Sequence, residues 1–291
     1  MDVCLMIEGQ EGVTWEQWLA LALATEEAGL GGLFRSDHYR SIVRGEPAGA
    51  LDAWAILAAL AARTERIRLG TMVSPVTFRP ASVLAKNAVT VDHVSGGRVE
   101  LGIGAGWYEA EHESYGFSFG TQRSRLDELD RQLEEITRQW TSAEDVEPRP
   151  LQRPRPPLIV GGRAGPRTVA AAVRHGDEYN TTFPSLDEAR ERALVVADAA
   201  RAAGRSPLRF SMMTGCVVGA DAADVRDRLG AWRAVVGGEG EPPLCGTVDQ
   251  VTSRLLDYAA AGVERAMLQH LVHEDVEMVA VLGEVAAQLA R

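Results

Sequence analysis

The feature that most constrains this chain is a regular alternation of short apolar runs with longer amphipathic segments. The apolar runs, which are typical of buried strands, are 3–7, 32–35, 67–73, 99–103, 157–161, 178–182, 209–218 and 265–270. The amphipathic segments, which favour helices, are 16–28, 52–63, 80–94, 123–141, 167–175, 186–203, 222–235, 247–261 and 275–289. Strands that alternate with helices predict a parallel sheet, because each helix carries the chain back to the same edge.

Local signals support the ends of several helices. Gly29, Gly204 and Gly262 follow amphipathic segments, at the position where a glycine commonly ends a helix. Asp52 precedes another segment and is a good N-cap. Eight strand–helix units close naturally into an α/β barrel, a (β/α)₈ TIM barrel, whereas an open doubly wound sheet suits six strands better. We therefore expect a single barrel domain over residues 1–291, with 143–157 as a connecting loop.

Charge and targeting signals exclude several classes of protein. The chain has 30 basic and 41 acidic residues, so its formal charge is 30 − 41 = −11. Nucleic acid and anionic membranes attract Lys and Arg, so neither is an expected partner. The N-terminus lacks a basic segment followed by an apolar one, and no uninterrupted apolar run reaches about 18 residues. We expect no leader peptide and no membrane span.

The cysteines and the common catalytic motifs narrow the chemistry further. Cys4, Cys216 and Cys245 are odd in number and far apart. This spacing is typical of neither a disulfide framework nor a zinc cluster, so we expect a reducing cytoplasm and no metal. The sequence contains no nucleophile elbow, no H-E-x-x-H motif and no P-loop. These absences argue against the usual hydrolases, zinc proteases and nucleotide triphosphatases.

Polar residues that follow the predicted strands are the candidates for chemistry, because barrel active sites lie where the strands end. His38 is the best acid or base among them, since imidazole titrates near neutral pH. The adjacent Asp37 would orient His38 or raise its pKa. The alternative is an Asp that caps the loop and a His that packs. His270 either lines the mouth of the pocket or is a histidine of the barrel rim whose hydrogen bonds are satisfied within the protein. Lone carboxylates such as Glu8 are too common to single out.

Two glycine turns follow neighbouring predicted strands. They are Gly104-Ala105-Gly106, followed by Trp107, and Gly161-Gly162-Arg163. Backbone amides in such turns approach a phosphate closely, and the alternative is a tight turn with no ligand. The first turn lacks the third glycine of a dinucleotide fingerprint. Trp107 would wall a flat aromatic ligand or simply pack in its loop.

Several strings of this chain resemble the luciferase-like monooxygenase superfamily. They are Ser36-Asp37-His38, the segment 69–73 and the segment 95–107, which reads S-G-G-R-V-E-L-G-I-G-A-G-W and is specific. Matches at 109–112, 157–162, 245–247 and 267–270 extend the resemblance over nearly the whole chain. The branch that the chain resembles most is that of the actinobacterial F420-dependent oxidoreductases.

The resemblance implies a barrel whose cofactor, coenzyme F420, lies across the C-terminal mouth. It implies that His38, with Asp37 beside it, acts near the deazaflavin ring. It also implies a cis peptide bond at Met72–Val73 that backs the ring. The cofactor phosphate is then expected against the backbone amides of 104–106 and 161–163. The implied reaction is hydride transfer between F420 and a small organic substrate, and homodimers are usual in this superfamily.

The chain departs from the family pattern at two places. Members that act on sugar phosphates carry a glutamate where this chain has Trp107, which argues against glucose-6-phosphate chemistry. The segment between Trp140 and Pro157 is also shorter than usual, and we expect its shortness to open the mouth of the site. Two other functions stay open. One is an FMN-dependent monooxygenase that uses oxygen, and the other is a barrel that binds a flavin without turnover.

Overall fold

Eight parallel strands form a closed ring in the computed structural model, which describes residues 1–43 and 48–290. The strands are β1 (Asp2–Ile7), β2 (Gly32–Arg35), β3 (Arg68–Thr71), β5 (Val99–Gly104), β6 (Leu158–Gly161), β7 (Glu178–Thr182), β8 (Arg209–Gly219) and β10 (Arg265–His270). β10 pairs with both β1 and β8, and these two pairings close the sheet. The predicted (β/α)₈ barrel is therefore confirmed, and the open doubly wound sheet is excluded.

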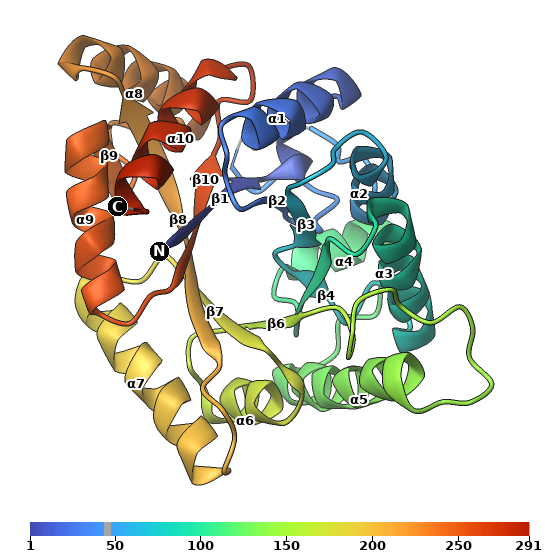
Figure 1. Cartoon of the computed structure of the whole chain (residues 1–291). Coiled ribbons are helices and arrows are strands. Elements are labelled where there is room, and N and C mark those ends of the chain that lie inside the picture. The colour runs from blue at the N-terminus through green and yellow to red at the C-terminus, as the bar shows by residue number, and fades with distance from the viewer. Residues whose placement is uncertain (44–47, 291) are drawn as a thin grey trace.

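The longer helices surround this ring (Figure 1). They are α1 (Trp15–Glu27), α2 (Ala53–Ala61), α3 (Ala81–Ser95), α5 (Gln122–Thr141), α6 (Pro166–His175), α7 (Leu186–Ala202), α8 (Ala222–Val236), α9 (Val248–Ala260) and α10 (Glu277–Leu289). Their ends lie within two residues of the predicted ones. Asp52 caps α2, as expected, by accepting hydrogen bonds from two backbone amides. Gly29 has a φ of 71°, the left-handed conformation that favours glycine after a helix.

Four short elements escape prediction from the sequence. They are η1 (Gly9–Glu11), β4 (Ser74–Pro75), α4 (Glu109–Tyr115) and β9 (Leu244–Thr247). None exceeds seven residues, which is too short for a hydrophobic period to show. In Figure 1 the chain ends lie toward the viewer and α4 is faded behind the strands. This unpredicted helix covers the face where the strands end, which is where the active site of a barrel lies.

The interior of the barrel is filled by one set of alternating side chains. It holds the buried cluster Cys4, Met6, Phe34, Met72, Ile159, Met213 and Met267. The other face of each strand packs on the helices, as Val3, Leu5 and Ile7 of β1 do. This division follows from the two-residue period of a strand. The three cysteines are free, and no described helix is long and apolar enough to cross a bilayer.

A buried charge cluster occupies the interior where the strands begin. Arg265 donates to Glu100 (Nη2 to Oε2, 2.7 Å) and to Glu178, and all three side chains are nearly inaccessible. Burial alone would raise the pKa of Glu100, but Arg265 and Arg68 outweigh it and lower that pKa below its usual value. Burial dominates at Glu178 and raises its pKa despite Arg265. Arg265 is therefore the cation that both carboxylates share, and Arg68 is a second cation for Glu100.

The connecting segment 142–157 lies at the N-terminal face of the barrel. It joins the end of α5 to the start of β6, so it runs where the strands begin. Asp92 of α3 anchors it by accepting hydrogen bonds from the backbone amides of Leu151 (2.5 Å) and Gln152 (3.2 Å). The expectation that a shorter segment opens the active-site mouth is therefore wrong, because the segment and the mouth are at opposite ends of the barrel.

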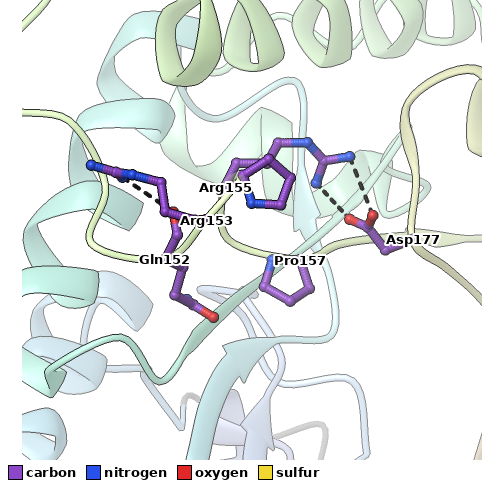
Figure 2. A pocket seen from close by; sticks show the side chains of 6 residues that line it. Gln152, Arg153, Arg155, Pro157 and Asp177 are labelled. Carbon is purple, nitrogen blue, oxygen red and sulfur yellow. Dashed lines mark hydrogen bonds and ion pairs between the residues drawn. The ribbon is translucent and has the colours of Figure 1, made fainter.

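A cavity of about 370 Å³ lies beside this segment (Figure 2). It is lined by Gln152, Arg153, Pro154, Arg155, Pro157 and Asp177. Arg155 donates to two nearby groups, Asp177 Oδ2 at 2.5 Å and the carbonyl of His175 at 2.6 Å. Asp177 in turn accepts from the amide of Leu158 at the start of β6. These contacts hold the segment against the barrel, remote from the strand ends.

Candidate active site

His38 is paired with Glu111, a residue that lies on α4. The distance from His38 Nδ1 to Glu111 Oε1 is 3.0 Å, and Glu111 is almost completely buried. The second oxygen of Glu111 accepts from the backbone amides of Tyr39 (2.5 Å) and Arg40 (3.1 Å). The carboxylate is thus fixed from three directions, and it fixes the imidazole. The expectation that Asp37 orients His38 is wrong, since Glu111 has that contact.

The surroundings of His38 favour its protonated form. Burial disfavours a charged imidazole, but the hydrogen bond and charge of Glu111 outweigh it and raise the pKa of His38 above its usual value. The more distant charges of Glu8 and Asp37 act in the same direction. The part of the prediction in which Asp37 raises this pKa is therefore confirmed, although its effect is smaller than that of Glu111.

Asp37 instead forms hydrogen bonds with the loop that follows β3. The side chain is fully buried, and its Oδ2 accepts from Ser74 Oγ and from Arg79 Nη1, both at 2.6 Å. Arg79 also reaches Asp52 Oδ2 at 2.6 Å. Successive side chains of an extended segment point to opposite sides, so neighbours such as Asp37 and His38 face different partners. Asp37 thereby ties the end of β2 to the segment that carries Val73.

Val73 packs on a row of glycines. The peptide bond Met72–Val73 is cis, as the resemblance implies. A β-carbon placed on Gly104 would lie 2.7 Å from Val73 Cγ2, and one on Gly161 would lie 3.1 Å from Val73 Cγ1. One on Gly102 would lie 3.2 Å from Val73 Cγ1 and closer still to the carbonyl oxygen of Thr71. A larger residue at Gly104 or Gly102 would therefore force its neighbours to move, and one at Gly161 would press on Val73. We call Val73 with Gly102, Gly104 and Gly161 the glycine cradle.

The two glycine turns lie side by side, because β5 and β6 are paired strands. Gly106 has a φ of 80°, which brings its turn against Pro75 and Thr77. In the second turn, the amide of Gly162 donates to the carbonyl of Asn180 (2.9 Å) and is therefore engaged. Arg163 is exposed at the same strand end. The structure thus brings together the two turns that the sequence analysis selected for a phosphate.

Trp107 stands at the rim beside His38. It is 62% exposed, the largest value among the exposed large apolar side chains of the described residues. Its ring meets the His38 imidazole edge-on at 5.7 Å and stacks with Tyr108 at 5.3 Å. Ala105, between the two glycines, packs toward the outer core instead. A solvent-exposed indole next to the imidazole is suited to contact a ligand.

His270 does not belong to this group. Its Nε2 contacts the carbonyl of Asp275 at 3.0 Å, and the side chain lies on the outer face of β10 with Leu268. Burial lowers the pKa of His270 to about 4. It is a neutral, satisfied histidine of the barrel rim, the second of the two alternatives. Glu111 is the functional candidate that sequence reasoning missed, because a seven-residue charged helix has no detectable period.

Comparisons with known proteins agree with this architecture. The family model described as luciferase-like monooxygenase matches residues 3–283. The uncharacterized protein Rv0953c of Mycobacterium tuberculosis is 35% identical over 229 residues, which cover 74% of each chain.

Two solved structures are similar to the whole fold. An F420-dependent secondary alcohol dehydrogenase, in complex with an F420–acetone adduct, has a TM-score of 0.80 and 18% identity and covers 99% of this chain and 98% of its own. The oxygenating constituent of 3,6-diketocamphane monooxygenase from Pseudomonas putida, in complex with FMN, has a TM-score of 0.79 and 16% identity, with 99% of each chain covered.

Proposed function

Because the chain belongs to the luciferase-like monooxygenase family, we propose that it is an oxidoreductase that transfers a hydride between coenzyme F420 and a small organic substrate. The observation that carries this proposal is the His38–Glu111 pair, which lies at the strand-end face together with the two glycine turns. An imidazole whose pKa is raised by a buried carboxylate is a proton donor that works near neutral pH. The homodimer and the cytoplasmic location remain predictions.

The residues present fit a flat, phosphate-bearing cofactor. The glycine cradle offers an apolar support, since Gly102, Gly104 and Gly161 leave the space that the Val73 side chain occupies. The turns 104–106 and 161–163 would hold the phosphate with backbone amides other than that of Gly162, which Asn180 engages, and Arg163 would add a positive charge. When bound, F420 supplies or accepts a hydride, and the protein provides binding, orientation and the proton. Trp107 would cover one side of the ligand.

The proton step is the part that the chain itself performs. Glu111 holds Nδ1 of His38, so Nε2 is the nitrogen that exchanges a proton with the substrate. Protonated His38 gives that proton to a substrate heteroatom when the neighbouring carbon receives a hydride, and neutral His38 takes it back in the reverse direction. Glu111 is a positioning residue, because it acts through the imidazole. The buried Asp37–Arg79 pair fixes the loop that carries Val73.

The second candidate is an FMN-dependent monooxygenase. The structural relative from Pseudomonas putida is described in complex with FMN, and the two cofactors share a tricyclic ring and a phosphate. The Ser36-Asp37-His38 string, which resembles the F420 branch, favours F420. A barrel that binds a flavin without turnover is a third possibility, and the intact His38–Glu111 pair argues against it.

The experiment that tests the proposal is a fluorescence titration of the apoprotein with F420 and, separately, with FMN. We expect saturable binding of F420 that is at least about tenfold tighter than that of FMN, a difference of about 1.4 kcal/mol. Preference for FMN would move the protein to the oxygen-using members, and oxygen uptake would then be measured. Binding of neither cofactor would remove the proposal.

The matched variant for this titration is Gly104→Val. A β-carbon at this position would lie 2.7 Å from Val73 Cγ2, so the cradle would fill or Val73 would move. We expect weaker binding of the preferred cofactor with retention of the circular dichroism spectrum. Gly116→Val is not a suitable control because of its positive φ, whereas Ala110→Val on the half-buried side of α4 leaves the cradle untouched.

Replacing Glu111 by glutamine is expected to lower the pKa of His38. The substitution removes the negative charge and keeps the shape, so burial is no longer outweighed. A raised folded-state pKa stabilises the fold fully below the unfolded pKa of His38, and this stabilisation is lost as pH rises through the folded pKa. Glu111→Gln should remove it. The measurement is an NMR titration of the His38 ring protons.

The pH profile of activity gives an independent readout of the same change. If protonated His38 donates the proton, the pH above which kcat/KM falls should move to lower pH in Glu111→Gln. Glu113→Gln is the charge-matched control, because Glu113 lies on the same helix but is exposed. An unchanged His38 titration in Glu111→Gln would contradict the role assigned to the pair.

A further inference from the structure

Glu8 is a buried carboxylate at the strand-end face that the proton step does not use. It directly follows β1 and continues the row of Cys4 and Met6, which point into the barrel. The side chain is only 7% exposed. It is close enough to His38 for its charge to count among those that offset burial there. Glu8 therefore belongs to the same face as the His38–Glu111 pair.

Two carboxamides hold Glu8 in place. Gln269 of β10 donates from Nε2 to Oε1 at 2.7 Å, and Gln10 of η1 donates from Nε2 to Oε2 at 2.8 Å. Gln10 is itself fixed by the hydroxyl of Ser36 at 2.5 Å. Within residues 1–43 and 48–290, no Lys, Arg or His forms an ion pair with Glu8. The carboxylate is thus oriented by neutral groups drawn from three separate parts of the chain.

This arrangement is costly for a purely structural role. A buried charge without an ion-pair contact is unfavourable, and glutamine would have the same shape without the charge. A carboxylate has about four acceptor sites, and the two amides occupy one on each oxygen. Each oxygen therefore retains capacity to accept another hydrogen bond. A ligand that donates a charge-assisted hydrogen bond would satisfy both the charge and the remaining acceptor sites.

The charges around His38 indicate which ligands are compatible. Asp37 is paired with Arg79. Glu8 forms no ion pair, although the buried Arg35 is close enough for the two charges to interact. Four carboxylates (Glu8, Asp37, Asp52 and Glu111) face three cations (Arg35, Arg79 and a protonated His38), so the surroundings of the imidazole keep a negative charge. A substrate carboxylate or phosphate would be repelled here, and an ammonium group would be attracted.

We propose that Glu8 determines substrate specificity by accepting a hydrogen bond from the ammonium group of an amine substrate. The inference rests on the proposed function, because it names the substrate class of the same site. Alcohols donate the same hydrogen bond to Glu8 but carry no positive charge, so they bind more weakly. Compounds that carry a carboxylate at this point are excluded. Gln269 and Gln10 are positioning residues, since they act by orienting the carboxylate of Glu8.

The test uses three probes of one shape, namely cyclohexylammonium, cyclohexanol and cyclohexanecarboxylate. Their dissociation constants are measured by ligand-observed NMR on the full chain, with and without the cofactor that the titration identifies. We expect the ammonium probe to bind wild type most tightly and the carboxylate probe most weakly. Glu8→Gln should weaken the ammonium probe by at least about tenfold, the effect of losing a hydrogen bond to a charged group, and leave cofactor affinity unchanged.

The wild-type ranking tests the proposal without any variant. Binding of the carboxylate probe as tight as that of the ammonium probe, or no binding of the ammonium probe, overturns it. Glu113→Gln, which changes the net charge equally at an exposed position, should keep the wild-type affinities. A structural role predicts a lower melting temperature for Glu8→Gln with unchanged probe affinities, and that result also overturns the proposal. Failure of the proposed function differs from these results, because it removes cofactor binding from wild type.

Discussion

Replacing His38 by alanine is expected to lower kcat by about 10²–10⁴-fold while the cofactor dissociation constant changes little. The imidazole is the only group that we assign to proton transfer, so its loss removes general acid–base catalysis. The glycine cradle and both glycine turns lie on other strands and remain intact. Glu111 keeps its two backbone amide partners, so the buried carboxylate is not stranded. The measurement is turnover of reduced F420 with a panel of imines and enones.

The control for this variant is His93→Ala. His93 is exposed on α3 and contacts the carbonyl of Arg149 at the opposite end of the barrel. It should retain wild-type turnover. If His38→Ala turns over within about threefold of wild type, a change below about 0.7 kcal/mol, then His38 does not carry the proton. A parallel loss of cofactor affinity would instead make His38 a binding residue.

The largest effect on stability is expected for Arg265→Met. The substitution leaves Glu100 and Glu178 buried without their shared cation. Removal of one partner from a buried ion pair typically costs about 3–5 kcal/mol, because the remaining charge is uncompensated. Met has a similar length and no charge, so packing changes little. The measurement is urea unfolding near neutral pH, followed by circular dichroism.

The pH dependence of this effect has a definite sign. In wild type the lowered pKa of Glu100 contributes stability above the unfolded pKa, and this is lost as pH falls through the folded pKa. In Arg265→Met, Glu178 loses the cation that lowers its pKa and Glu100 keeps only Arg68. Both pKa values therefore rise relative to wild type, so protonation at low pH reduces the cost of the substitution. The difference in stability from wild type should therefore narrow as pH falls from about 8 to about 5.

A compensated variant separates charge from packing. The triple substitution Glu100→Gln, Glu178→Gln and Arg265→Met removes all three charges, and we expect it to recover most of the lost stability. If the triple variant is as unstable as Arg265→Met, the loss comes from packing. If Arg265→Met is as stable as wild type near neutral pH, the charge cluster does not stabilise the end of the barrel where the strands begin.

The barrel was predictable because its signals are local. Strands such as β1 and β6 are apolar runs whose boundaries the sequence indicates to within one residue, and the long helices have a period of their own. The short elements span too few residues to show either signal. α4 is charged and spans seven residues, so nothing in its composition distinguishes it from a loop. Only packing against the strand ends makes it a helix.

The sequence by itself determined the alternation of strands and helices, and with it the set of residues that follow each strand. His38 and the two glycine turns could be located in this way, whereas the cis bond at Met72–Val73 was implied by the resemblance to the luciferase-like family. The tertiary structure decided which groups face one another. Glu111 is 73 residues from His38 in the chain but 3.0 Å away in space, whereas Asp37 is adjacent and faces Arg79. Partners of this kind are set by ring closure, because closing the barrel brings distant strand ends together while extended backbone turns neighbouring side chains apart.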